Sequence, residues 1–338
     1  MAPRAFICGC SSTVLTADEE AFIRQAEPWG LILFKRNVAD RAQMRALTDR
    51  FRELTGRADA AILIDQEGGR VQRMGGEHWP AYPSAARLSA AASDPAEQAQ
   101  VVALATRLIA HDLAEVGVNI DCLPVLDLPA PGSHAIIGDR AYGATPETVA
   151  RLGRAAADGL LAGGVLPVFK HVPGHGRARA DSHLELPTVE TSREELERSD
   201  FAPFRANADL PVAMTAHVVF KAIDPDRPAT LSPIVVREII RGFIGFDGLL
   251  MSDDLSMKAL SGTFAERAKN LFAAGVDLAL HCNGDLAEAG EVAAETPALT
   301  GKAAERAKTA LSRVSGTLMA FDPVDSRQKL AAALAGAA

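Results

Sequence analysis

Short apolar runs alternate with longer amphipathic, alanine-rich segments along almost the whole chain. Strands that are apolar on both faces and separated by helices are typical of a parallel sheet. The pattern predicts eight strands, at Ala5–Gly9, Gly30–Leu33, Ala61–Ile64, Val118–Leu123, Val165–Phe169, Val212–Thr215, Leu249–Met251 and Leu278–His281. The helices predicted between them are Asp18–Trp29, Arg41–Leu54, Pro95–Val116, Pro146–Ala162, Ser192–Ala208, Pro233–Gly242 and Phe264–Ala274.

Eight strand–helix units in 338 residues predict an α/β fold of the (β/α)₈ TIM-barrel type. The alternative is a doubly wound open sheet, but no Gly-x-Gly-x-x-Gly follows the first strand. Since no linker divides the chain, residues 1–338 are expected to form a single domain. Two or three C-terminal helices, at about Leu286–Glu295, Gly301–Met319 and Ser326–Leu334, are expected to pack outside the barrel.

Charge and composition exclude several classes of protein. A net charge of −8 with scattered Lys and Arg argues against binding to nucleic acid or anionic membranes. No run reaches the about 18 apolar residues of a membrane span, and Ala5–Cys10 is shorter than the about 7–15 apolar residues of an export segment. The cysteines lack metal-binding spacing, so we expect buried free thiols in a reducing cytoplasm at Cys8, Cys10, Cys122 and Cys282.

The segment Phe169–Pro187 concentrates residues suited to catalysis. Lys170 and His171 follow the fifth strand, and Asp181 and His183 come after a Pro/Gly-rich loop. In an extended loop, side chains at i and i+2 point the same way. Asp181 can therefore accept a hydrogen bond from one imidazole nitrogen of His183, which is how a histidine is oriented for general acid/base chemistry.

Other polar side chains also follow predicted strands, at the end of a barrel where catalytic groups gather. They are Asp65, Glu67 and Arg70 after the third strand, Asp127 and Arg140 after the fourth, His217 after the sixth, Asp253 and Asp254 after the seventh, and His281 at the end of the eighth. Asp253 is the candidate nucleophile, because a rigid strand end holds a carboxylate in place for attack. The structural alternative is that Asp253 or Asp254 caps the next helix.

The chain resembles glycoside hydrolase family 3, specifically the single-domain bacterial β-N-acetylglucosaminidases of peptidoglycan recycling. The resemblance covers nearly the whole chain, and its most specific part is Lys170–Gly176 (KHVPGHG) followed by Asp181-Ser-His183. The other matching segments are Leu33–Asn37, Ile64–Arg73, Gly138–Arg140 and Ser252–Met257.

The resemblance implies that Asp253 is the nucleophile, His183 the acid/base and Asp181 the partner of His183. It implies that the sugar hydroxyls are held by Asp65, Arg73, Arg140, Lys170 and His171. The implied reaction removes terminal N-acetylglucosamine with retention, through a covalent glycosyl-enzyme. The implied substrate carries N-acetylglucosamine on 1,6-anhydro-N-acetylmuramic acid, with or without a peptide. No cofactor, metal or partner chain is expected, and we expect a monomer.

Several alternatives to these roles remain open. Asp65 and Arg70 could form a structural ion pair, Lys170 could snorkel from the core, and Glu67 is a supporting residue and the alternative acid/base. His175 and His217 are expected to pack or to support other residues.

The activity also has alternatives. A phosphorylase would use the same residues with phosphate in place of water, and a catalytically silent sugar-binding protein is the non-enzyme alternative. A metal-dependent hydrolase would use His171 and His175 as ligands, but Pro173 and Gly174 between them prevent the helical geometry of such a pair.

Overall fold

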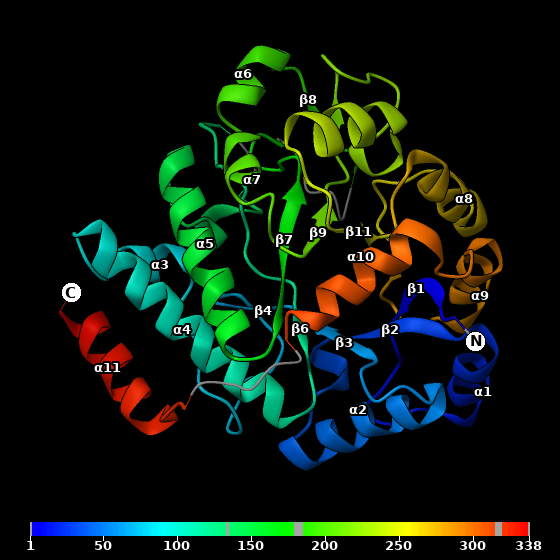
Figure 1. Cartoon of the computed structure of the whole chain (residues 1–338), viewed down its shortest axis with the longest axis horizontal. Helices are drawn as coiled ribbons and strands as arrows, with labels where there is room; N and C mark the ends of the chain where they lie inside the picture. Colours follow the sequence, from blue (N-terminus) through cyan, green and yellow to red (C-terminus); the bar gives the residue numbers. More distant parts are fainter. Residues whose placement is uncertain (1, 133–134, 179–184, 315–319, 337–338) are drawn as a thin grey trace.

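Eight parallel strands form a closed barrel (Figure 1). The computed structural model describes residues 2–132, 135–178, 185–314 and 320–336. The barrel strands are β1 (Arg4–Cys8), β2 (Pro28–Leu33), β3 (Ala61–Ile64), β6 (Ile120–Asp121), β7 (Leu166–Val172), β9 (Val212–Thr215), β11 (Leu249–Asp254) and β12 (Leu278–His281). Because β1 pairs in parallel with both β2 and β12, the sheet closes on itself. The predicted TIM barrel is confirmed, and the open-sheet alternative is wrong.

Helices cover the outside of the barrel (Figure 1). Those between strands are α1 (Ala17–Ala26), α2 (Arg41–Thr55), α3 (Ala85–Ser89), α4 (Pro95–Glu115), α5 (Pro146–Ala162), α6 (Arg193–Arg198), α7 (Ala202–Ala206), the π-helix η4 (Val235–Phe243) and α8 (Phe264–Ala274). Short 3₁₀ turns are η1 (Lys35–Asn37), η2 (Gly138–Arg140) and η3 (Ala229–Leu231). The sequence accounts for several helix starts: Thr16 forms a capping box with Glu19 at α1, and Asp94 and Thr145 cap helices that begin with proline.

Side chains along each strand alternate between the barrel interior and the layer under the helices. The interior residues include Ile7, Ile32, Leu63, Val168 and Met251. Their neighbours Phe6, Leu31, Ile62, Phe169 and Leu250 pack outward. This alternation decides which polar residues at the strand ends reach the barrel mouth.

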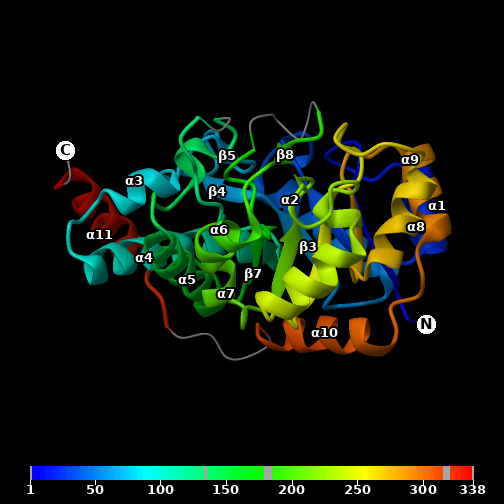
Figure 2. The ribbon, with the colours of Figure 1, turned by 90° about the horizontal axis from the view of Figure 1, so that it is seen from above.

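The two ends of the barrel differ. Helix α10 (Gly301–Ser312) lies across one end, where Ala307 and Ala310 pack against the interior core. Figure 2 shows α10 on the opposite side of the molecule from the short strands β4 (Gln66–Gly68), β5 (Val71–Gln72) and β8 (Thr188–Val189), the last of which pairs with β10 (Val219–Phe220). Helix α9 (Leu286–Glu295) packs beside β12 and α11 (Pro323–Ala335) beside α4. The open mouth is therefore at the carboxyl ends of the strands.

Prolines explain where the predicted elements were wrong. The predicted helix Asp18–Trp29 ends at Ala26, because Pro28 cannot continue a helix and instead begins β2. The predicted helix Ser192–Ala208 is two helices, α6 and α7, since Pro203 has no N–H for the ladder that would join them.

Two further predictions were too long. The predicted strand Val118–Leu123 is regular only at Ile120–Asp121, because its chain turns before Pro124, where Leu123 N–H bonds the Asp121 carbonyl. The predicted helix Gly301–Met319 ends at Ser312, and the last five residues of the prediction, 315–319, lie outside the described residues.

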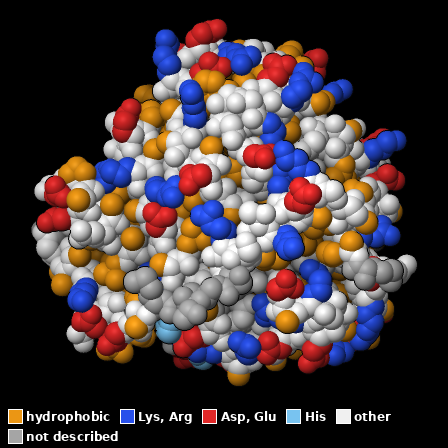
Figure 3. All heavy atoms as spheres, viewed as in Figure 1, with side chains coloured by type: hydrophobic (Ala, Val, Ile, Leu, Met, Phe, Trp, Pro, Cys, Tyr) orange, Lys and Arg blue, Asp and Glu red, His pale blue; other side chains and the backbone are white. Residues whose placement is uncertain are grey.

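The distribution of surface charge and the burial of the cysteines are as expected from the sequence. Figure 3 shows acidic and basic side chains interspersed over the face it displays. Among the described residues, no helix combines the length and the apolar character needed to cross a bilayer. The cysteines are free and buried, as predicted: Cys8, Cys10, Cys122 and Cys282.

Candidate active site

A cavity of about 310 Å³ opens at the carboxyl ends of the strands. Its volume is near the lower end of the range for small-molecule sites, about 300–1,000 Å³. Six predicted site residues line it: Asp65, Arg73, Arg140, Lys170, His171 and Asp253. Because these residues follow or end β3, β6, β7 and β11, the barrel brings together side chains that are far apart in the sequence.

Lys170 is buried between two carboxylates. Its Nζ lies 2.7 Å from Asp65 Oδ1 and 2.7 Å from Glu67 Oε1, and the residue is 2% exposed. Burial alone would lower the pKa of Lys170, but the two carboxylates raise it, so the ammonium stays charged. The snorkelling alternative is wrong, because the ammonium lies inside the protein. Arg73 also donates to Asp65, from Nη2 to Oδ2 at 2.9 Å.

Glu67 connects the same network to Arg140. Arg140 donates to it from Nε at 2.8 Å and from Nη2 at 2.9 Å, a bidentate pair. Burial alone would raise the pKa of Glu67, but Arg140 and Lys170 lower it to about 2. Glu67 therefore has the supporting contacts that were predicted. An ionised carboxylate has no proton to donate, which makes it a poor alternative acid.

Arg70 lies at the rim of the cavity and does not pair with Asp65. Its Nε is 3.1 Å from Asp139 Oδ1, and its Nη2 donates to the carbonyls of Ala135 and Ile136. The predicted alternative of an Asp65–Arg70 ion pair is wrong. Arg70 instead binds the backbone of the loop that leads to Arg140.

Replacing Glu67 by alanine is expected to lower the free energy of unfolding by about 3–5 kcal/mol, because Arg140 and Lys170 would keep buried charges with one partner fewer. Urea unfolding at pH 7, followed by circular dichroism, measures the loss. The control is Glu53→Ala, which removes an exposed pair with Arg50 (3.0 Å) and should cost less than about 1 kcal/mol. Equal losses in the two variants would contradict the assigned role of Glu67.

Asp253 faces the cavity because of the alternation along β11. Leu249 and Met251 point into the barrel, so Asp253, two residues further on, points the same way. Its Oδ1 accepts a hydrogen bond from the backbone N–H of Asp254 at 2.8 Å. The position therefore has the rigid strand end that was predicted for a nucleophile.

The carboxylate of Asp254 is used in a turn. Its Oδ1 accepts from the backbone N–H groups of Ser256 (2.9 Å) and Cys282 (3.1 Å), and its Oδ2 from the Ser256 hydroxyl (2.6 Å). The next helix, α8, is capped by Thr263. The alternative that Asp253 or Asp254 caps that helix is therefore wrong.

The predicted acid/base His183 and its partner Asp181 lie outside the described residues. The chain leading to them passes His171 and His175, which both line the cavity. Burial and the neighbouring His171 lower the pKa of His175 to about 4, so its ring is neutral near pH 7. The roles of Asp181 and His183 stay predictions.

His281 was wrongly expected at the mouth. Leu280 and Cys282 face the interior, so His281 between them points outward, where its Nε2 lies 3.2 Å from Glu288 Oε2. His217 is fully buried and packs as expected: its ring nitrogens contact Thr230 Oγ1 (2.7 Å) and the Asp254 carbonyl (3.0 Å).

The apolar part of the cavity wall was not predicted from the sequence. It comprises Ile32, Phe34, Val71, Ile136, Ile137, Met214, Met257, Leu280 and Cys282. Phe34 also packs against the Arg73 guanidinium, 5.1 Å from its ring centre. Phe34 and Met257 lie in two of the matching segments, which could have marked them, whereas Ile136 is brought to the wall by a loop. Such a mixed lining is typical of small-molecule sites.

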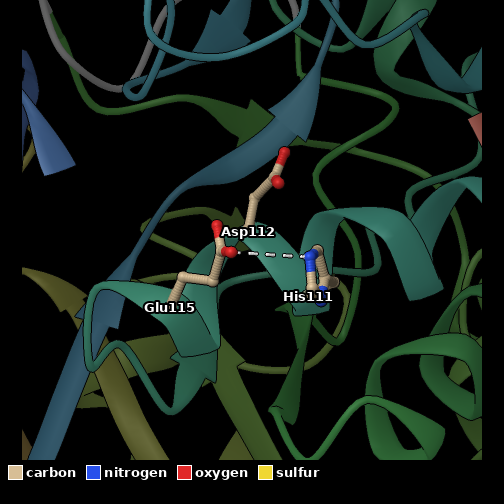
Figure 4. Close-up of side chains that lie close together, drawn as sticks. All are labelled: His111, Asp112 and Glu115. Carbon is tan, nitrogen blue, oxygen red and sulfur yellow. Dashed lines mark ion pairs between the residues drawn. The ribbon is translucent and has the colours of Figure 1, made fainter. Parts of the chain in front are cut away.

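A cluster of possible metal ligands among the described residues lies outside the cavity. His111, Asp112 and Glu115 lie on α4, with ligand atoms within 4.8 Å of one another (Figure 4). The Asp112 carboxylate already accepts from the Tyr82 hydroxyl (2.7 Å) and from Arg327 (2.7 Å) of α11. We interpret the cluster as part of the contact between α4 and α11, and it does not support the metal-hydrolase alternative.

Known proteins are similar to this chain in sequence and in fold. The profile described as Glycosyl hydrolase family 3 N terminal domain matches residues 11–315. A β-hexosaminidase of Alkalilimnicola ehrlichii is 41% identical over 280 residues, which are 81% of this chain and 79% of that protein. One from Tolumonas auensis is 38% identical over 315 residues, 91% of this chain and 89% of that protein. The crystal structure of NagZ from Neisseria gonorrhoeae in complex with N-trifluoroacetyl-D-glucosamine aligns with a TM-score of 0.84 and 32% identity, over 99% of this chain and 97% of that one.

Proposed function

The chain belongs to glycosyl hydrolase family 3 and is a glycoside hydrolase of the β-hexosaminidase type, and from this premise we propose that it is a retaining exo-β-N-acetylglucosaminidase. The observation that carries the proposal is the cavity, whose wall contains Asp253 together with the charged groups of Asp65, Arg140 and Lys170. A small cavity at the end of a closed barrel suits one terminal sugar. The proposed substrate carries N-acetylglucosamine on 1,6-anhydro-N-acetylmuramic acid, with or without a peptide.

In the first step of the proposed mechanism, the Asp253 carboxylate attacks the anomeric carbon. The bond to the leaving oxygen breaks, and that oxygen takes a proton from His183. The product is a sugar ester of Asp253. Asp181 orients the imidazole and stabilises its charged form, as carboxylates do in other such pairs.

In the second step, neutral His183 removes a proton from water, which attacks the same carbon and releases Asp253. Two inversions give net retention, so N-acetylglucosamine leaves as the β-anomer. A neutral base suits this step because it does not repel the incoming hydroxide-like oxygen.

The sugar hydroxyls are proposed to bind Asp65, Arg73, Arg140, Lys170 and His171. Each of these residues lines the cavity, and four of them are already fixed by ion pairs. Fixed charged groups favour a substrate that satisfies them, since an analogue without the hydroxyl leaves a buried group unpaired. The N-acyl glucosamine bound to the Neisseria gonorrhoeae protein supports this choice of sugar.

We place this activity in the cytoplasm. The four cysteines are free and buried, which suits a reducing compartment.

The proposed function is tested by sugar preference and by product. With aryl glycosides, kcat/KM for the β-N-acetylglucosaminide is expected to exceed that for the β-glucoside about 100-fold or more. Proton NMR should detect the β-anomer of N-acetylglucosamine first. Equal turnover of both aryl glycosides would refute the sugar assignment. Added phosphate should leave the product unchanged, and N-acetylglucosamine 1-phosphate would instead identify a phosphorylase.

A further inference from the structure

Asp127 contacts His171 from outside the cavity. The carboxylate is completely buried and is not part of the cavity wall. Its Oδ2 lies 2.7 Å from Nδ1 of His171. Its Oδ1 accepts from the backbone N–H of His175 at 2.6 Å and from that of His171 at 3.4 Å. One carboxylate therefore holds both the ring and the backbone of the turn from residue 171 to 175.

These contacts determine where the imidazole carries its proton. Burial alone would raise the pKa of Asp127, but His171 and the hydrogen bond from the backbone N–H of His175 lower it, so the carboxylate is ionised and can only accept. Nδ1 of His171 must then carry the hydrogen of the 2.7 Å contact. His171 lines the cavity, and its other ring nitrogen, Nε2, is the one that Asp127 does not contact.

We propose that Asp127 is a positioning residue that fixes the His171 proton on Nδ1 and so presents Nε2 to the sugar as a hydrogen-bond acceptor. The proposal rests on the proposed function in one respect, the role of His171 in holding a sugar hydroxyl. The position of the proton on His171 is a property of the free protein and does not depend on that role. A hydroxyl that donates to Nε2 is recognised only while that nitrogen has no hydrogen.

The variant Asp127→Asn keeps the size of the side chain but is expected to change which nitrogen of His171 carries the proton. The two backbone N–H groups at Oδ1 need an acceptor, so the amide oxygen of the new residue takes that place. Its NH₂ group then faces Nδ1 of His171, which must become the acceptor. The hydrogen of the neutral ring moves to Nε2, and the sugar hydroxyl meets a donor where it needs an acceptor.

Activity tests the consequence. Asp127→Asn is expected to lower kcat/KM for an aryl β-N-acetylglucosaminide about 10- to 100-fold, mainly through KM, the size of effect seen when the orienting partner of a ligand histidine is removed. Asp224→Asn is the matched control: this buried carboxylate also accepts from a backbone N–H (Asp226, 3.1 Å) and from a hydroxyl (Ser232, 2.6 Å), outside the cavity. It should change kcat/KM less than about threefold.

A double-mutant cycle tests whether Asp127 acts through His171. In a His171→Gln background, where the amide nitrogen replaces Nε2, adding Asp127→Asn should cost less than about threefold. Substrates lacking the 3-, 4- or 6-hydroxyl provide a second check. Wild-type protein should cleave each of them with a lower kcat/KM than the complete substrate. For one of the three, this difference should disappear in Asp127→Asn. Additive losses in the cycle, with all three analogues still penalised, would show a structural role and overturn the proposal.

Nitrogen-15 NMR of histidine-labelled wild-type protein at pH 8 measures the tautomer directly, with His171→Gln used for assignment. We expect a protonated Nδ1 and an unprotonated Nε2 at His171, and the reverse in Asp127→Asn. An unprotonated Nδ1, or protons on both nitrogens, in the wild type would overturn the proposal even if Asp127→Asn does not fold. This result does not depend on sugar turnover, so it stays informative if the proposed function fails.

Discussion

Asp253→Ala is expected to lower kcat by about four to six orders of magnitude, because the variant has no carboxylate to form the glycosyl ester. The side chain lies at the end of β11, so its removal changes no barrel strand pair. A 2-fluoro sugar that reacts quickly and hydrolyses slowly should accumulate as an adduct on wild-type protein. Mass spectrometry after digestion should find the label on the peptide that contains Met251–Met257.

Asp254→Asn is the control for that experiment. The amide keeps an oxygen for the backbone N–H groups of Ser256 and Cys282, so the turn should persist with a modest loss of stability. Its kcat should stay within about tenfold of wild type. A label on any other carboxylate, or a small effect of Asp253→Ala, would refute Asp253 as the nucleophile.

His183→Ala is expected to act selectively, according to the leaving group. A general acid contributes about 10²–10⁴-fold when the departing oxygen is a poor leaving group. Cleavage of the natural disaccharide should therefore fall by about that amount, whereas the first step with a highly activated aryl glycoside should be nearly unchanged. Hydrolysis of the glycosyl-enzyme then limits turnover, because the same residue must activate water.

Azide provides the second half of this test. It needs no base, so it should restore turnover of the activated substrate by His183→Ala and yield the β-glycosyl azide. Asp181→Ala should show the same pattern more weakly, as expected for a residue that orients the acid. Equal losses on both substrates with no azide effect would make His183 a binding or structural residue. Glu67 would be a poor replacement, since Arg140 and Lys170 hold it ionised.

Much of the site could be predicted because, in a parallel barrel, the residues that follow each strand lie at the same end of the barrel. Asp65, Lys170, His171 and Asp253 each follow an apolar run, and a closed parallel barrel brings all such ends to one mouth. His281 fits the same description and was nevertheless misplaced. A strand end has two sides, and the one-residue register that selects between them is fixed by pairing with neighbouring strands.

The sequence by itself determined the barrel, its strand order along the chain and the residue types at its mouth, since hydrophobic periodicity and capping residues act locally. Only the tertiary structure decided which charges meet. Three sets of contacts join residues that are far apart in the sequence. They are the ion pairs of Glu67 with Arg140 and Lys170, the ion pair of Arg70 with Asp139, and the contact of Asp127 with His171. A buried charge takes the partner that the fold places within hydrogen-bond reach, because leaving it unpaired costs several kcal/mol, and that partner is set by packing across the barrel.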